Sequence, residues 1–243
     1  MIWTFAIASA FFIGLSKGGL KGMGPIFVLL MLQAVGGKSS TGLVLLLLLF
    51  GDSMALYSYR KYIQKAYVMR FLPWVFGGVV VGTWIGRDLS ETNFKQIIAG
   101  IILISTGIMA LWDLYLKKEV KPGPLITGVT GTGTGVFTML GNLGGAFSNI
   151  FFLLTKLPKK ELIGTSTLIY LAVNLFKLPF HVFIWKTINW QVILLDLKLL
   201  PAVLIGFLVG LKAVHYISEI WYRRFLYIVT FLGALFVLMN SFF

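Results

Sequence analysis

Four of the ionisable residues inside or beside long apolar runs have a chemistry that gives the first indication of function. They are Lys17, Lys21, Asp52 and Lys177. An ammonium group in a low-dielectric setting attracts carboxylates, sulfonates and similar anions strongly. A buried carboxylate takes up a proton unless a cation lies beside it, so Asp52 is the predicted proton-coupling residue. The alternatives are that the lysines reach lipid headgroups and that Asp52 only forms an ion pair, with Lys177 as its partner.

Uncharged polar side chains near the same positions could complete an anion site by donating hydrogen bonds. Asn174 lies one helical turn before Lys177 and therefore on the same face of a helix. Such hydroxyls and amides could instead join helices to one another. The predicted anion-binding residues are Ser16, Lys17, Lys21, Asn142, Ser148, Asn149, Thr165, Asn174 and Lys177.

Enzyme motifs are weak in this chain. Residues 14–18 match the Gly-x-Ser-x-Gly pattern of a nucleophile elbow, and His181 and His215 could act as bases. That elbow joins a strand to a helix, whereas these residues lie in an apolar helical stretch. The chain has no cysteine, and no cluster of His, Asp and Glu has metal-ligand spacing. We therefore expect no catalytic residue, no metal and no cofactor.

Composition predicts that the chain is embedded in lipid. Of its 243 residues, 58% are hydrophobic and 12% are charged, which leaves too little polar surface for a water-soluble globule. The net charge of +13 lies in short Lys and Arg clusters between apolar runs, as in cytoplasmic loops that face anionic lipid. We therefore expect a multi-pass protein of the cell inner (plasma) membrane, with lipid as a partner and no binding of nucleic acid.

The apolar runs predict about eight membrane elements. Six runs have about 20 residues, the length of helix that crosses a hydrocarbon core. They are 40–59, 68–86, 94–115, 161–185, 190–213 and 222–239. Two further segments, 2–35 and 124–157, are too long for one straight span and are interrupted near their middles by glycine. That pattern is typical of broken or re-entrant helices.

The two halves of the sequence also match each other. The matched pairs are Gly14 with Gly135, Gly24 with Gly145, Gly42 with Gly164, Asp52 with Asn174, Pro73 with Pro201, Gly78 with Gly206 and Gly82 with Gly210. Chance alignment of glycines is the alternative. The pattern predicts two transmembrane repeats, 1–121 and 122–243, each with one broken or re-entrant helix and three transmembrane helices.

The positions of the basic residues predict the orientation of the repeats. If each interrupted element crossed the membrane once, the loop Lys and Arg would divide about equally between the two faces. If each element enters and returns on one side, the opposite face keeps only Lys38, Arg87, Lys95 and Lys186, in accord with the positive-inside rule. We therefore predict an all-α polytopic membrane protein with two inverted-topology repeats and both termini outside the cytoplasm. An anion site is expected near the midplane, where the two glycine-rich tips approach each other.

Over nearly its whole length the chain resembles the sulfite exporter TauE/SafE family, the 4-toluene sulfonate uptake permeases. In the first half the resemblance rests on residues 14–20, on Gly24-Pro25, and on Asp52 with residues 57–60; in the second it rests on residues 164–166, 174–175 and 177–179. The second half departs from the family at residues 141–146, where a glycine run closed by proline is common. The resemblance implies secondary transport of small sulfur-containing anions, such as sulfite, sulfonates or sulfoacetate, through duplicated halves and without ATP.

An anion channel is the main alternative, because anion pores also use basic residues and helix ends. A non-transporting membrane protein is a third class, although it would not need paired glycine interruptions. Saturable counterflow would favour a carrier, and large single-channel currents would favour a pore. The sequence leaves open the direction of transport, the coupling ion and the oligomeric state, for which a homodimer is one option.

Overall fold

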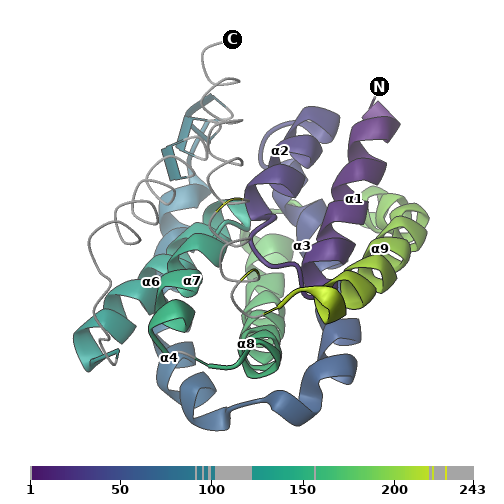
Figure 1. Cartoon of the computed structure of the whole chain (residues 1–243). Helices are drawn as coiled ribbons and strands as arrows, with labels where there is room; N and C mark the ends of the chain where they lie inside the picture. Colours follow the sequence, from purple (N-terminus) through teal and green to yellow (C-terminus); the bar gives the residue numbers. More distant parts are fainter. Residues whose placement is uncertain are drawn as a thin grey trace.

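The computed structural model describes residues 2–90, 92–94, 96–97, 100–101, 122–155, 157–218, 221 and 228, and this part of the chain is helical without strands. The elements of the first half are α1 (Ile2–Gly18), α2 (Gly24–Val35), α3 (Ser39–Tyr59), the 3-10 turn η1 (Arg60–Tyr62) and α4 (Lys65–Arg87). Those of the second half are α6 (Pro124–Gly141), α7 (Gly145–Thr155), α8 (Lys159–Pro179), the π-helical turn η2 (Phe180–Ile184) and α9 (Trp190–Tyr216) (Figure 1).

Four helical stretches in the described residues are long and apolar enough to cross a membrane. They are Ser39–Tyr62, Lys65–Arg87, Lys159–Ile184 and Trp190–Tyr216. These stretches confirm the predicted spans at 40–59, 68–86, 161–185 and 190–213. The other two predicted spans, 94–115 and 222–239, lie almost entirely outside the described residues. By length and composition, the observed helices fit a membrane protein.

The first interrupted element is a helical hairpin. The Ser9 hydroxyl in α1 donates a hydrogen bond to the Phe27 carbonyl oxygen in α2 at 2.6 Å. In one continuous helix these two residues would lie about 27 Å apart, so the chain folds back between them. The reversal uses Gly19 and Gly22, whose φ angles of 129° and 95° are readily reached only by glycine.

The second interrupted element folds back in the same way. α6 ends at Gly141, and the next residue, Asn142, adopts a left-handed conformation with φ 58° and donates its backbone N–H to the carbonyl oxygen of Thr138. The rings of Phe137 in α6 and Phe147 in α7 then lie 4.5 Å apart, centroid to centroid. Asparagine tolerates this backbone region better than other non-glycine residues, which explains why the reversal occurs at Asn142.

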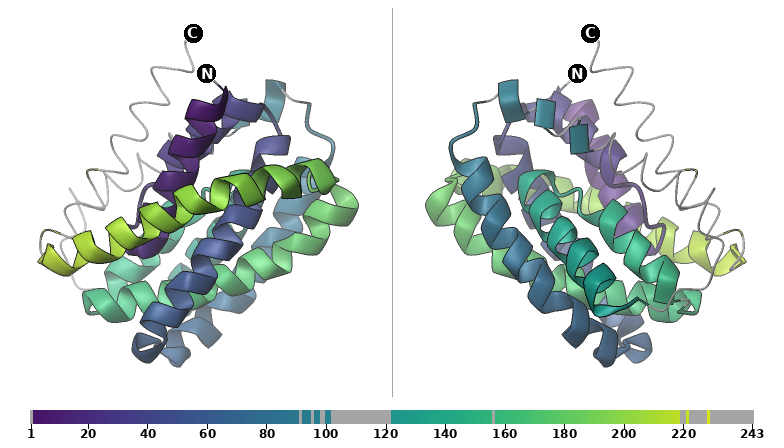
Figure 2. Two further views of the ribbon diagram at one scale, coloured as in Figure 1. Left: turned by 90° about the vertical axis from the view of Figure 1, so that its right-hand side faces the viewer. Right: turned by 90° about the vertical axis from the view of Figure 1, so that its left-hand side faces the viewer.

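Glycines allow one close helix packing to occur twice. α1 packs against α9, and α4 packs against α6, as the left and right views of Figure 2 show. A Cβ atom on Gly14 would lie 2.1 Å from the Val203 carbonyl oxygen, and one on Gly135 would lie 2.1 Å from the Val75 carbonyl oxygen. Both glycines are therefore required for backbone contact between the paired helices, and they are matched positions of the two halves.

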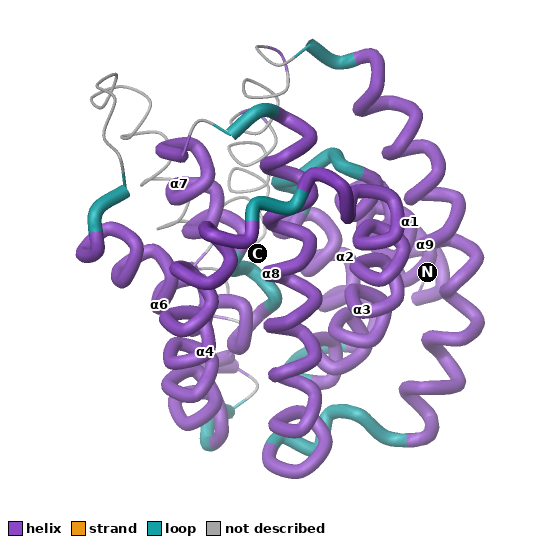
Figure 3. Tube along the Cα trace, turned by 90° about the horizontal axis from the view of Figure 1, so that it is seen from below, coloured by secondary structure: helices purple, strands orange, loops and turns teal. Residues whose placement is uncertain are grey.

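Besides the α1–α9 and α4–α6 contacts, the two halves also meet where α3 packs against α8. Figure 3 shows α8 in the middle of the bundle, with α4 and α6 on one side and α1 and α3 on the other. Apolar side chains fill two clusters, one built mainly by α1, α2, α3 and α9 and the other mainly by α4, α7 and α8. The contact between α3 and α8 brings the polar residues of both halves together.

Candidate functional site

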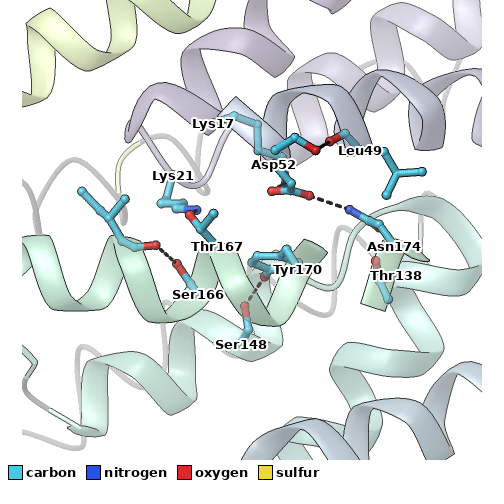
Figure 4. A network of polar contacts seen from close by, with 12 residues as sticks. Lys17, Lys21, Leu49, Asp52, Thr138, Ser148, Ser166, Thr167, Tyr170 and Asn174 are labelled. Carbon is cyan, nitrogen blue, oxygen red and sulfur yellow. Dashed lines mark hydrogen bonds and ion pairs between the residues drawn. The ribbon is translucent and has the colours of Figure 1, made fainter. Parts of the chain in front are cut away.

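A buried carboxylate lies at the centre of the polar network. Asp52 in α3 is 0% exposed and accepts a hydrogen bond from the Lys17 ammonium at 2.6 Å, forming an ion pair. Its other oxygen accepts a hydrogen bond from the Asn174 side-chain amide in α8 at 2.8 Å. Figure 4 shows Asp52 with these two partners. Since Lys17 occupies the last turn of α1, the hairpin reversal positions its ammonium against α3.

The second buried lysine of the network has a different partner. Lys177 in α8 donates to the side-chain oxygen of Asn142 at 2.6 Å, and the Asn142 amide nitrogen donates to the Thr41 carbonyl oxygen at 3.1 Å. The alternative in which Lys177 pairs with Asp52 is therefore wrong, because Lys17 holds that place. Lys177 instead fixes the tip of the second hairpin against α8.

A cavity of about 70 Å³ opens beside this network. One water molecule needs roughly 10–15 Å³ by the same measure, so the cavity has room for a small polyatomic ion. Both hairpin reversals contribute to its wall, through Gly22 and Gly24 in the first half and Leu143 and Gly145 in the second. The predicted site residues that line it are Ser16, Lys17, Lys21, Asn142, Asn149 and Asn174.

Two ammonium groups approach one aromatic ring at the cavity. The ammonium nitrogens of Lys17 and Lys21 lie 5.1 Å and 5.7 Å from the centroid of the Tyr170 ring. Cation–π attraction stabilises ammonium groups at such distances. Lys21 also has a long contact, 3.5 Å, to the Thr167 hydroxyl. The Lys21 ammonium is therefore held more loosely than that of Lys17, which has a carboxylate.

Three predicted site residues do not line the cavity. Thr165 accepts the backbone N–H of Gln64 at 3.0 Å and so joins α8 to the segment before α4. Ser148 hydrogen bonds to the Tyr170 hydroxyl and so helps to fix the position of the Tyr170 ring. Lys177 contacts the cavity wall through a short hydrogen bond to Asn142 and longer contacts to Thr138 and Asn174.

Three lining residues with polar side chains were not predicted: Thr138, Ser166 and Tyr170. Ser166 and Tyr170 lie two turns and one turn before Asn174 on α8, so their helical spacing from a predicted residue was the available signal. Thr138 precedes Asn142 by one turn of α6 in the same way.

The buried cluster contains more cationic than anionic groups. Lys17, Lys21 and Lys177 are all buried, and Asp52 is the carboxylate beside them. Among the described residues the ion pairs are Lys17 with Asp52 and the surface pair Arg87 with Asp88. Uncompensated buried charge is unfavourable, so the cluster in its charged form is suited to an anion in the cavity.

Two buried residues with unsatisfied polar atoms lie away from the cavity. In the described part of the chain, the buried side-chain nitrogen and oxygen atoms without a hydrogen-bond partner are His181 Nε2 and both carboxyl oxygens of Asp196. His181 lies in the π-helical turn η2, and Asp196 lies in α9. No group of His, Asp and Glu among the described residues could hold a metal ion.

Comparisons with known proteins identify a family for the chain. The family model described as "Sulfite exporter TauE/SafE" matches residues 6–237. Searches of curated proteins and of solved structures give no match. The matched range includes both hairpin reversals and every lining residue of the cavity.

Proposed function

Because this chain belongs to the sulfite exporter TauE/SafE family, we propose that it is a secondary transporter of a small sulfur-containing anion. Family membership makes it a membrane transport protein, and its four long apolar helices agree with that assignment. The proposed substrates are sulfite, short sulfonates and sulfoacetate-like anions. The proposed location is the cell inner membrane, which the chain would cross several times.

The observation that carries the proposal is the cavity between the two hairpin reversals. Two buried ammonium groups line it. Lys17 and Lys21 supply charge, while the Asn142, Asn149 and Asn174 amides can donate hydrogen bonds to substrate oxygens. The cluster has three ammonium groups and one carboxylate in their charged forms, which favours an anion with two negative charges over one with a single charge. Sulfite and sulfoacetate both meet this requirement.

We propose that residues 1–121 and 122–243 are inverted repeats. The glycine contacts that pair α1 with α9 and α4 with α6 occur at matched positions, which supports a two-fold relation between the halves. Asp52 and Asn174 are also matched positions, and they hydrogen bond to each other, as expected for residues close to a two-fold axis. In this arrangement each hairpin would enter and leave the membrane on one side.

The Lys17–Asp52 pair suggests how the anion could be coupled to a proton. An anion entering the cavity competes with Asp52 for the Lys17 ammonium. When Lys17 turns to the anion, Asp52 loses its cation in a buried setting and its protonated form becomes favourable. One proton would then be carried with each anion, on Asp52. After the anion leaves, Lys17 returns to Asp52 and the proton is released.

The experiment that tests the function is radiolabelled uptake by the purified protein in lipid vesicles. We expect saturable sulfite uptake that is accelerated by unlabelled sulfite on the opposite side of the membrane, because a carrier exchanges its substrate. Thiosulfate, sulfoacetate and acetate as competitors would rank the substrates. Replacement of the exposed Lys61 by threonine serves as the control for loss of a positive charge outside the cavity. Large single-channel currents without counterflow would indicate a channel, and absence of any anion flux would refute the proposal.

A further inference from the structure

The buried polar face of α8 continues beyond the cavity. Asn174, Lys177 and His181 follow one another at spacings of three and four residues, which places them on one helix face. They are 1%, 0% and 0% exposed, respectively. Of the three, only Asn174 lines the cavity. The buried polar face therefore extends from the cavity toward the C-terminal end of α8 and the loop after η2.

His181 has one satisfied ring nitrogen and one unsatisfied ring nitrogen. Its Nδ1 lies 2.8 Å from the Thr187 hydroxyl oxygen, whereas its buried Nε2 has no hydrogen-bond partner. Buried polar atoms in native proteins are nearly always hydrogen bonded, so an exception calls for an explanation. If the Thr187 hydroxyl donates to Nδ1, Nε2 carries the hydrogen and is a free donor inside the protein.

Contacts from other elements hold this imidazole in place. A Cβ atom on Gly42 would lie 2.6 Å from the Thr187 carbonyl oxygen, so the loop carrying Thr187 is pressed against α3. The Trp185 ring lies 5.1 Å from the His181 ring, and its N–H donates to the Thr83 carbonyl oxygen at 3.1 Å. His181 itself lies in a π-helical turn, a feature found often at functional sites.

Lys177 separates this imidazole from the cavity. Its ammonium donates to the Asn142 oxygen at 2.6 Å and has only longer contacts, 3.5 Å each, to the Thr138 hydroxyl and the Asn174 oxygen. The Asn142 amide is itself fixed to the Thr41 carbonyl oxygen. Breaking the single short hydrogen bond of Lys177 would free its ammonium, which lies on the same helix face as His181.

We propose that Lys177 Nζ and His181 Nε2–H form a second binding position for the transported oxyanion, between the central cavity and the far end of α8. This inference rests on the proposed transport function. The anion reaches the second position when Lys177 exchanges the Asn142 oxygen for an oxygen of the anion. His181 then donates its unused N–H to another oxygen of the same ion. In the present conformation the position is closed by the contact between Lys177 and Asn142.

The test separates binding in the cavity from movement out of it. His181→Leu removes the donor, and His181→Gln keeps a donor on a neutral side chain. Sulfite-dependent thermal stabilisation of the detergent-purified protein reports on the cavity, and sulfite counterflow in vesicles reports on transport. We expect both variants to bind sulfite as the wild type does. We expect His181→Leu to lower counterflow by roughly tenfold or more, the effect of losing a hydrogen bond to a charged group, and His181→Gln to retain most of it.

Thr187→Val provides a second route to the same answer if His181→Leu does not fold. It frees Nδ1 and allows the imidazole to turn, so it should also slow counterflow without weakening sulfite binding. Wild-type counterflow in a folded His181→Leu would overturn the second position. Where His181→Leu does not fold, wild-type counterflow in Thr187→Val would overturn it. Equal loss of counterflow in His181→Leu and His181→Gln would also overturn it. Absence of sulfite binding in the wild type would instead refute the proposed function.

Discussion

The two hairpin reversals occupy corresponding places in the two halves but differ in charge. The first presents Lys17 and Lys21, and the positions one repeat later are Thr138 and Asn142. All four residues line the same cavity. Duplication of the helical framework therefore supplies two equivalent tips, while only one of them carries the ammonium groups. The comparison indicates that the framework builds the cavity and that a few substitutions in one half decide what the cavity binds.

The helices that follow the hairpins show the same division. Asp52 in α3 corresponds to Asn174 in α8, and Ala55 in α3 corresponds to Lys177 in α8. The first half thus combines its lysines with a carboxylate, whereas the second half has a lysine that hydrogen bonds to an amide. Replacing a residue by the one at the matched position tests the role of this asymmetry with a side chain that the framework already accommodates.

The largest effect is expected for Lys17→Thr. This substitution places at position 17 the residue type of the matched position in the second hairpin, Thr138. The variant removes an ammonium group from the cavity and leaves Asp52 buried without its cation. Removing one partner of a buried ion pair typically costs about 3–5 kcal/mol, so we expect sulfite counterflow to fall by at least ~100-fold. Counterflow in vesicles measures this change, with Lys61→Thr as the control. A rate within a few-fold of the wild type would show that the cavity does not use the Lys17 charge.

A different kind of loss is expected for Asp52→Asn, which turns the hydrogen-bonded pair of Asp52 and Asn174 into two amides. Without a carboxylate the site cannot carry a proton, so uphill sulfite accumulation driven by a pH gradient should be abolished. Exchange of sulfite across the membrane should continue, because it needs no net proton movement. The two assays use the same vesicles with and without the gradient. Unchanged uphill accumulation would exclude Asp52 as the coupling residue.

A smaller effect is expected for Lys21→Asn, which copies Asn142 into the first tip. Lys21 has no carboxylate partner among the described residues and only a long contact to Thr167, so its removal leaves the network around Asp52 intact. We expect the apparent affinity for sulfite to fall roughly tenfold, about 1.4 kcal/mol, with little change in the maximal rate. A concentration series of uptake measures both quantities. Unaltered affinity would restrict the anion site to Lys17.

The smallest effect concerns stability. Asp196 in α9 is buried without a hydrogen-bond partner, and its matched residue in α4 is the buried Val68. Since an unpaired buried polar group costs about 1–3 kcal/mol, Asp196→Val should raise the thermal unfolding temperature. The reverse substitution, Val68→Asp, should lower it. A lower unfolding temperature for Asp196→Val would reveal a stabilising role of the carboxyl group.

Hydropathy and glycine placement were sufficient to predict much of the framework. Apolar length located α3, α4, α8 and α9, because each must exclude water over the whole thickness of the membrane. Clustered glycines located both reversals, because few other residues adopt the backbone conformations that a tight turn between helices needs.

Individual contacts of the site were harder to predict, because they depend on how elements pack. From the sequence, Lys177 was the expected ion-pair partner of Asp52, whereas the fold-back between α1 and α2 places Lys17 there instead. Thr165 was predicted and its neighbour Ser166 was not. Adjacent helical residues point about 100° apart, so Ser166 faces the cavity while Thr165 faces Gln64. Tyr170 counted as an apolar residue in the predicted span 161–185, so its hydroxyl was not considered as part of the site.

The most direct test of the account is to locate the anion itself. Selenite is a close analogue of sulfite, and its selenium atom can be located by anomalous X-ray scattering in crystals of the protein. The account predicts one strong selenium peak in the cavity between Lys17, Lys21 and Asn142, and its loss in crystals of Lys17→Thr. A peak confined to surface lysines, with an empty cavity at saturating selenite, would contradict the central claim.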